Sequence, residues 1–158
     1  MTENLNIRRA KESDIASLAQ LAGELGYRTT TAEMNKRFKE LSRNSQDGIF
    51  VAEFDDVVGW IHVSLIQSLE SDPFAEIHGL VVAEVHRNFG IGRRLVAAAE
   101  EWAKEKSCLR IRVRTNIIRE KTRIFYKNLG FESTKTQEVF DKMLGDGGPI
   151  SHSSRALA

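Results

Sequence analysis

The chain has a single cysteine, no long apolar run and almost no excess of charge of either sign. Cys108 alone cannot form an intramolecular disulfide and no cysteine–histidine spacing is typical of a zinc site, so we expect a reduced, packed thiol and no bound metal. Lysine and arginine number 23 against 22 acids, which gives no reason to expect nucleic acid or an anionic membrane as the main partner. No apolar segment could span a bilayer, and the first residues lack the apolar stretch of a signal peptide. We therefore expect a soluble, cytoplasmic protein.

Length and composition suit one globular domain. The chain has 158 residues, 41% of them hydrophobic, which is enough for a sizeable core. The final stretch "GDGGPISHSSRALA" is rich in glycine and serine, as is typical of a mobile tail. We predict a single domain over residues 1–144 and a flexible tail over residues 145–158.

Four helices are predicted from the apolar periodicity. The first should be capped by Ser13 and end at Gly26, and a capping box that begins at Thr30 should open the second. The third should follow a glycine-bearing turn and reach about residue 106. The fourth is expected over residues 120–129.

Strands are predicted where β-branched and aromatic residues gather between turn signals. They are expected at residues 6–10, 48–54, 57–66, 75–82, 109–115, 130–135 and 138–144. The second and third should form an antiparallel hairpin, with a bulge at Gly59. One strand–helix–strand crossover among antiparallel neighbours predicts an α/β (α+β) fold, in which helices cover a mixed sheet.

The turn in "VVAEVHRNFGIGRRLVAAAEEW" has the composition of an anion site. No carboxylate lies between Glu84 and Glu100, while three arginines surround two glycines. Glycines let backbone N–H groups approach a ligand closely, and a following helix adds the positive end of its dipole. The spacing matches neither a Walker motif nor the dinucleotide-binding fingerprint. An ordinary strand-to-helix turn with solvated arginines is the alternative.

The longer string "HGLVVAEVHRNFGIGRRLVAAAEEWAKEK", followed by "RTN" and "RIFYKNLGF", resembles the GNAT superfamily of acyl-CoA-dependent N-acetyltransferases. Arg87, Gly90 and Gly92 match the family's loop Arg/Gln-x-x-Gly-x-Gly/Ala, and "FYKNLGF" matches the helical segment that brings a tyrosine to the thioester. The resemblance extends to about Leu144 and implies a twisted mixed sheet, splayed at its centre for acetyl-CoA. The stretches "LAGELGY" and "TKTQEVFDKML" are similar to bacterial members of the aminoglycoside-acetyltransferase-like kind.

This resemblance implies acetyl-CoA as co-substrate. The turn would hold the pyrophosphate with its backbone N–H groups, assisted by two arginines, and the strand before it would present its backbone to the pantetheine arm. The expected cofactor-binding residues are Leu80, Val81, Val82, Arg87, Asn88, Phe89, Gly90, Ile91, Gly92, Arg93, Asn116 and Tyr126. For Asn116, a cap of the following turn is an equal alternative.

Three residues are candidates for the chemistry. Acetyl transfer to an amine needs a base for the amine proton and an acid for the departing thiolate. The resemblance places the hydroxyl of Tyr126 beside the coenzyme sulfur, as that acid. Glu76 and His78 alternate on one strand and should share a face. We favour Glu76 as a water-relayed base or amine anchor, with a salt bridge as the alternative; His78 is the second candidate base, with a satisfied histidine as the alternative.

The predicted activity is direct transfer of an acetyl group from acetyl-CoA to a primary amine of a small molecule. A protein or peptide N-acetyltransferase, or a non-catalytic CoA-binding regulatory module, are the alternatives. Arg110, Arg112 and Arg114 give one strand a basic face. We expect that face to be solvated or salt-bridged, with an acidic substrate or dimer contact as the minority reading; a homodimer is possible from the resemblance.

Overall fold

The computed structural model describes residues 4–146. These form two compact units, one that ends at Arg114 and one that begins at Thr115, and each is described by itself. Most of the predicted tail, residues 147–158, lies outside the described residues.

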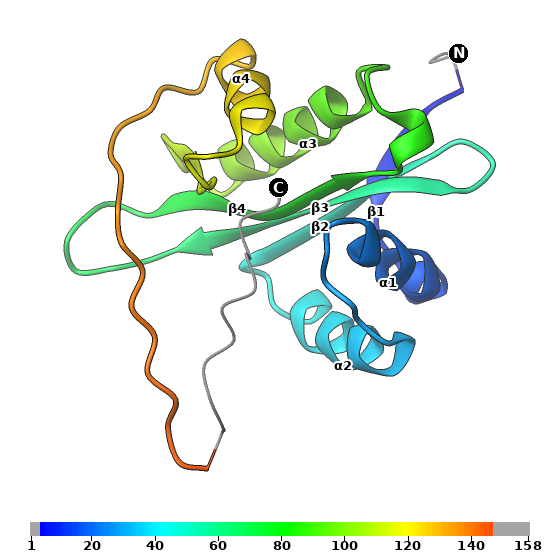
Figure 1. Cartoon of the computed structure of the whole chain (residues 1–158), viewed down its shortest axis with the longest axis horizontal. Helices are drawn as coiled ribbons and strands as arrows, with labels where there is room; N and C mark the ends of the chain where they lie inside the picture. Colours follow the sequence, from blue (N-terminus) through cyan, green and yellow to red (C-terminus); the bar gives the residue numbers. More distant parts are fainter. Residues whose placement is uncertain (1–3, 147–158) are drawn as a thin grey trace. The chain divides into compact units, whose positions relative to one another are not determined.

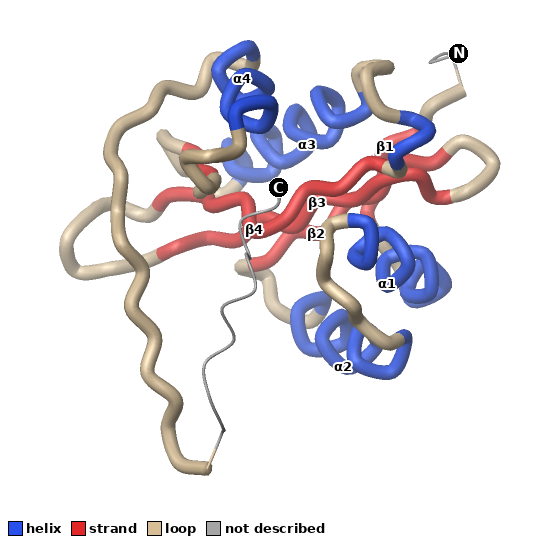
Figure 2. Tube along the Cα trace, in the orientation of Figure 1, coloured by secondary structure: helices blue, strands red, loops and turns tan. Residues whose placement is uncertain are grey.

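The first unit is built on one five-stranded sheet with strands in sequence order (Figure 2). Its strands are β1 (Asn6–Arg9), β2 (Asp47–Glu53), β3 (Val57–Ile66), β4 (Phe74–Val82) and β5 (Ile111–Val113). The first four pair antiparallel, and β5 runs parallel to β4. The mixed sheet predicted from the sequence is confirmed, although β5 is shorter than its apolar alternation indicated.

Helices cover both faces of this sheet. α1 (Ile15–Glu24) and α2 (Thr31–Ser42) lie on one face, and α3 (Ile91–Glu105) lies on the other (Figure 1). On the first face Ile15, Leu18 and Phe38 pack with Val51 of β2. The second face is filled by the apolar stripe of α3, whose buried members are Ile91, Leu95, Val96, Ala99, Trp102 and Ala103. Three helices and a crossover therefore sit where the periodicity predicts them.

The starts of α1 and α2 differ in how well the sequence predicted them. Thr30 and Glu33 form the expected capping box, with the Glu33 N–H donating to Thr30 Oγ1 at 3.1 Å. Ser13 does not cap α1, so that prediction was wrong. A short 3-10 turn, η1 (Glu12–Asp14), comes first, and Asp14 is the N-cap residue of α1, with no side-chain capping bond to that helix. Its carboxylate accepts hydrogen bonds from Arg8 and from the Lys11 N–H.

The second unit contains α4 (Glu120–Asn128), as predicted, followed by Gly130 with a φ of +93°. Residues 131–144 adopt neither helix nor strand, so the two strands predicted at 130–135 and 138–144 were wrong. Strands are stabilised by the backbone hydrogen bonds of a neighbour. No ladder is formed by this stretch within the described residues, and Val139 and Phe140 are exposed. Alternating apolar residues therefore predicted strands here, but in the part of the chain that the structure describes the stretch has no neighbouring strand with which to pair.

Candidate active site

The glycine-bearing turn leads from β4 through a second 3-10 turn, η2 (Glu84–His86), into α3. Gly90 is the N-cap of α3 with a φ of +80°, a left-handed conformation that glycine adopts without strain. No side chain caps this end, and the first turn of α3 holds no acid. Because the first N–H groups of a helix have no intrahelical acceptor, this end of α3 can accept an anion.

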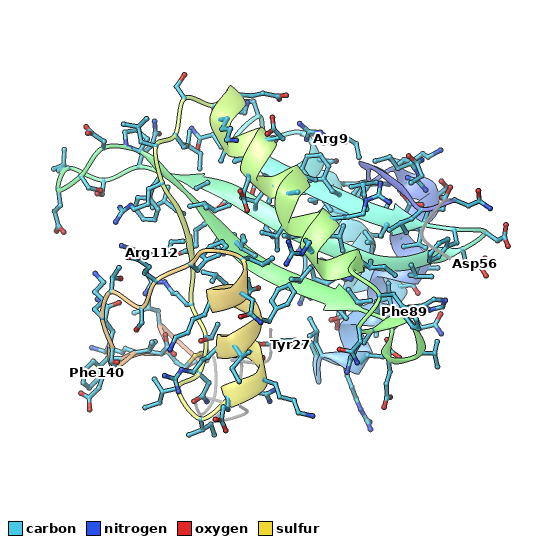
Figure 3. The ribbon with its side chains drawn as sticks, turned by 90° about the horizontal axis from the view of Figure 1, so that it is seen from above. Arg9, Tyr27, Asp56, Phe89, Arg112 and Phe140 are labelled. Carbon is cyan, nitrogen blue, oxygen red and sulfur yellow. The ribbon has the colours of Figure 1, made fainter. Side chains whose placement is uncertain are left out.

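The three arginines near the turn have different surroundings. Arg87 and Arg93 are exposed, and Arg87 also donates from Nε to the carbonyl of Val82 at 2.9 Å. Arg94 turns away and donates to the carbonyl of Leu5 at 3.1 Å, which ties α3 to the start of β1. Phe89 lies at the turn, half exposed, just before α3 (Figure 3). Two of the three arginines therefore stay close to the predicted anion site.

One edge of β4 becomes available where β5 ends. β5 pairs with β4 only at Ala75, Glu76 and Ile77. Further along, Leu80, Val81 and Val82 pair with β3 on one side, and no strand of the described residues pairs with their other side. An extended ligand can add to such an edge through its own amide groups. The side chain of Val81 itself is core, at 2% exposure.

A β-bulge shapes β4 immediately before that edge. His62 of β3 is opposite Gly79, but the next residue, Val63, is opposite Ile77, so His78 is the extra residue. A bulge re-aims side chains and increases local twist. Gly79 lies under the ring of Trp60, where an added Cβ would come within 3.0 Å. The second β-bulge, in the β2–β3 hairpin, lies at Val58 beside the predicted Gly59.

Glu76 and His78 lie on the same face of β4, as their spacing indicates, with Nδ1 of His78 3.9 Å from Oε2 of Glu76. Glu76 is nearly buried and accepts a hydrogen bond from Nε of Arg114 at 2.9 Å. The salt bridge expected as the alternative for Glu76 and for Arg114 is thus present in the structure. Arg110 and Arg112 instead lie over the ring of Phe74, at 4.3 and 4.5 Å from its centre.

The environment of His78 favours its neutral imidazole. The side chain is 40% exposed, and its partial burial is the first cause that lowers the pKa of His78 below its usual value; the neighbouring His62 is the second. Glu76 and Asp47 act in the opposite direction, and Arg114 lowers it further. A neutral imidazole at physiological pH can accept a proton, as a general base must.

In the second unit Tyr126 packs edge-on against Phe125 and Phe131, with ring centres 5.0 and 5.3 Å apart. Its side chain is buried, its hydroxyl has no hydrogen-bond partner among the described residues, and burial raises the pKa of Tyr126 far above its usual value. The phenol therefore keeps its proton and can donate one hydrogen bond. Asn116 forms a turn before α4, where its Oδ1 accepts the N–H of Ile118 at 3.1 Å.

Three residues of this site were missed in the sequence. Ser64, His62 and Asp47 come from β3 and β2, and register places them on the same sheet face as Glu76. The run "GWIHVSLI" carried a signal, because His62 and Ser64 alternate with buried Ile61 and Val63 in an otherwise apolar strand. The pairing partner on β4 could not be read from that run.

Other features lie outside this site. A hollow of about 570 Å³ between α3 and β1–β2 is lined by Arg9, Phe50, Arg94 and Trp102, and contains none of the predicted site residues. Cys108 is a buried free thiol, as predicted, and burial raises its pKa. Among the described residues no cluster of three or more metal-ligating side chains occurs. No helix in that part of the chain is long and apolar enough to cross a membrane.

Comparison with known proteins agrees with this geometry. The model of the acetyltransferase (GNAT) family matches residues 15–131. The chain belongs to the GNAT family. A relative called aminoglycoside N(6')-acetyltransferase type 1, from Serratia marcescens, is 33% identical over 99 residues, which cover 63% of this chain and 66% of the relative. This GNAT protein is an acetyl-CoA-dependent N-acetyltransferase, as the resemblance implied.

Two solved structures show how far the fold is shared. An aminoglycoside N-acetyltransferase in complex with CoA superposes with a TM-score of 0.80 at 20% identity, over 89% of this chain and 95% of the other. A protein described as a transcriptional regulator from Bacillus halodurans C-125 superposes with a TM-score of 0.78 at 26% identity, over 87% and 99%. The GNAT fold thus extends over most of the chain.

The residues present fit acetyl-CoA. A Cβ added at Gly90 would have nothing within 4 Å, so ligand atoms can approach the backbone there. The uncapped start of α3 and exposed Arg93 suit a pyrophosphate, and the unpaired edge of β4 suits a pantetheine arm. The orphaned hydroxyl of Tyr126 suits a sulfur or oxygen acceptor.

Proposed function

We propose that this acetyltransferase acetylates a primary amine of a small molecule by direct transfer. The observation that carries the proposal is the pair Glu76 and His78, a carboxylate and a neutral imidazole 3.9 Å apart, directly before the exposed edge of β4. When bound, acetyl-CoA supplies the activated acetyl thioester. A carboxylate beside a base is what a cationic amine needs in order to be held and deprotonated.

The cofactor would be held by residues 80–82 and 87–93. The backbone of Leu80, Val81 and Val82 would pair with the pantetheine amides, and N–H groups from Asn88 to Arg93 would donate to the pyrophosphate. Arg87 and Arg93 would add positive charge, since both are exposed at the turn. Asn116 would have a lesser part, because its Oδ1 already accepts the N–H of Ile118.

On the acceptor side we assign His78 as base and Glu76 as anchor. Glu76 is paired with Arg114, so its carboxylate is already engaged and can orient an ammonium group without taking its proton. His78 has the lowered pKa that leaves a lone pair available near neutral pH. This reverses the order favoured from the sequence, in which Glu76 came first.

Tyr126 would donate a hydrogen bond to the departing thiolate. Because burial raises the pKa of Tyr126, the hydroxyl acts as a hydrogen-bond donor more readily than as a full acid. A donor held in place still stabilises the charge that develops on sulfur. Tyr126 therefore keeps its proposed place at the sulfur, as a donor in place of the acid that the resemblance implied.

The names of the relatives support one chemical class of acceptor for the first test. The Serratia marcescens relative is named for the 6' amine of an aminoglycoside, so we propose a polyamino sugar as the first acceptor to test. A protein or peptide N-terminus is the second candidate acceptor.

One titration followed by one panel separates these candidates. Acetyl-CoA is titrated calorimetrically into the protein, with desulfo-CoA and 3'-dephospho-CoA as comparisons. Thiol release is then measured with aminosugars, linear polyamines and peptides that carry a free N-terminus. Turnover with aminosugars supports the proposal, turnover only with peptides replaces the acceptor class, and tight acetyl-CoA binding without turnover of any amine in the panel contradicts both acceptor classes.

A further inference from the structure

A chain of side-chain contacts connects His78 on β4 to β3 and, through β3, to β2. Nε2 of His78 makes a short hydrogen bond with Oγ of Ser64 on β3. The His78 ring lies 5.0 Å from the ring of His62, centre to centre, and the two planes are tilted by 37°. Nε2 of His62 lies 2.8 Å from Oδ1 of Asp47 on β2. These contacts hold the imidazole from two sides.

We propose that Ser64, His62 and Asp47 are positioning residues that fix the ring orientation and the tautomer of His78, so that Nδ1 is the atom that takes the acceptor's proton. The inference rests on the proposed function, because it deepens the assignment of His78 as base. None of these three residues is required to touch the substrate.

The hydroxyl of Ser64 can donate or accept, and the proposal assigns it the acceptor role. With the proton on Nε2 donated to Ser64 Oγ, Nδ1 keeps its lone pair on the side of Glu76, 3.9 Å away. The acceptor ammonium first gives one proton to Nδ1, and the neutral nitrogen then forms its bond to the acetyl carbon as the bond between that carbon and sulfur breaks. The nitrogen releases its second proton as the amide forms, and the departing thiolate, which accepts a hydrogen bond from Tyr126, takes up a proton from solvent. The positive charge formed on His78 lies beside the Glu76 carboxylate, which stabilises it.

Ser64 is placed to hold the ring and not to attack a substrate. A serine, a histidine and a carboxylate in a row are also the parts of a nucleophilic triad. However, Ser64 is only 8% exposed and lies within the regular pairing of β3, opposite Glu76. A nucleophile must reach the reacting carbon, whereas an orienting hydroxyl only needs to reach the imidazole.

The charges around His78 come from four elements. Asp47 on β2 and Glu76 on β4 favour its protonated form, whereas His62 on β3 and Arg114 after β5 disfavour it. His62 stands between His78 and Asp47, with its Nε2 2.8 Å from Oδ1 of Asp47. Removal of the His62 ring should therefore raise the pKa of His78, since the opposing Asp47 remains.

The first test compares Ser64→Thr with Ser64→Val in protein labelled with 15N-histidine. The two side chains have the same shape, and only threonine keeps the hydroxyl. We expect Ser64→Thr to keep a pyrrole-type Nε2 and a pyridine-type Nδ1 for His78, as in the parent protein. Ser64→Val should show averaged shifts of both nitrogens and lose about tenfold in kcat/KM at unchanged acetyl-CoA affinity.

The second test follows the titration of His78 in His62→Gln. Glutamine can still donate to Asp47, so the strand contact is retained while the ring is lost. We expect the NMR titration of His78 and the acidic limb of the kcat/KM profile to move together to higher pH. If His62 had only a structural role, its replacement would not shift the His78 titration and the acidic limb of the profile together.

Two results would overturn the inference. One is a Ser64→Val protein whose His78 shifts and pH profile equal those of Ser64→Thr. The other is a His62→Gln protein in which the His78 titration stays in place. The NMR readouts need no acceptor amine, so they test the inference even if no amine is acetylated. Absence of acetylation would refute the proposed function, whereas unchanged NMR shifts and titration would refute the inference.

Discussion

The Nε atom of Arg114 lies 2.9 Å from Oε1 of Glu76, and this contact joins the end of β5 to the bulged strand β4. The side chain of Glu76 is 11% exposed, whereas that of Arg114 is 57% exposed. A nearly buried carboxylate is stable only with a partner. The same arginine also influences His78, whose pKa it lowers. Arg114 therefore acts on both the candidate anchor, Glu76, and the candidate base, His78.

Replacement of Arg114 should show both effects. In Arg114→Met we expect a loss of about 1–2 kcal/mol in stability, because the nearly buried Glu76 loses a partner whose own side chain is 57% exposed. The acidic limb of the kcat/KM profile should also move to higher pH, because the cation that lowers the pKa of His78 is gone. Arg114→Lys is the control that keeps the charge and should keep the profile. An unmoved limb in Arg114→Met would show that His78 is not the titrating base.

Loss of the Tyr126 hydroxyl should reduce turnover without a cost in stability. The hydroxyl is buried without a partner among the described residues, so Tyr126→Phe removes an unsatisfied group. We expect an unchanged or slightly higher melting temperature, an unchanged acetyl-CoA affinity, and a kcat about 10–100 times lower. Thermal melts, calorimetry and steady-state kinetics measure the three quantities. Normal kcat in a fully folded variant would remove Tyr126 from the chemistry.

A carboxylate in the turn should oppose the pyrophosphate. In Gly92→Asp the new charge stands in the first turn of α3, where the structure has no acid, and we expect acetyl-CoA affinity to fall by at least about tenfold through like-charge repulsion. Gly23→Asp is a matched control, because Gly23 lies in α1 with nothing within 4 Å of an added Cβ. Equal affinity in the two variants would contradict the anion site. Their melts exclude unfolding as the cause.

The sequence was sufficient to predict the elements whose positions depend on residues close together in the chain. Helices α2 and α3 begin where a capping box and a glycine turn predict, and the β2–β3 hairpin follows its alternating pattern. α1 begins one residue later than predicted, after a 3-10 turn whose last residue, Asp14, is bound by Arg8 of β1. Local signals do not report such contacts.

The candidate site was predicted only where its residues share one segment. Glu76 and His78 could be paired from a spacing of two, and the turn from its glycines and missing acids. Ser64 and Asp47 could not be added, because their places depend on strand register and on the bulge at His78. A bulge shifts the facing residue by one, and nothing in "EIHGLVV" fixes where the extra residue falls.

Acid should weaken the first unit at the start of α1. Asp14 is buried, makes hydrogen bonds of 2.7 and 2.9 Å with Arg8, and its pKa is lowered chiefly by the Arg8 contact. Because the folded-state pKa lies below the unfolded value of about 3.9, the ionised carboxylate stabilises the fold above that pH, and this stability is lost as the pH falls through the folded-state pKa.

Asp14→Asn should therefore cost about 2–3 kcal/mol at neutral pH, and the difference from the parent protein should shrink below about pH 4. Urea unfolding at a series of pH values measures both quantities. Glu12→Gln removes an exposed acid from the same turn and serves as the control, with little expected effect at any pH. A difference between parent and Asp14→Asn that stayed constant down to about pH 2 would show that the Asp14 contribution is packing and not its paired charge.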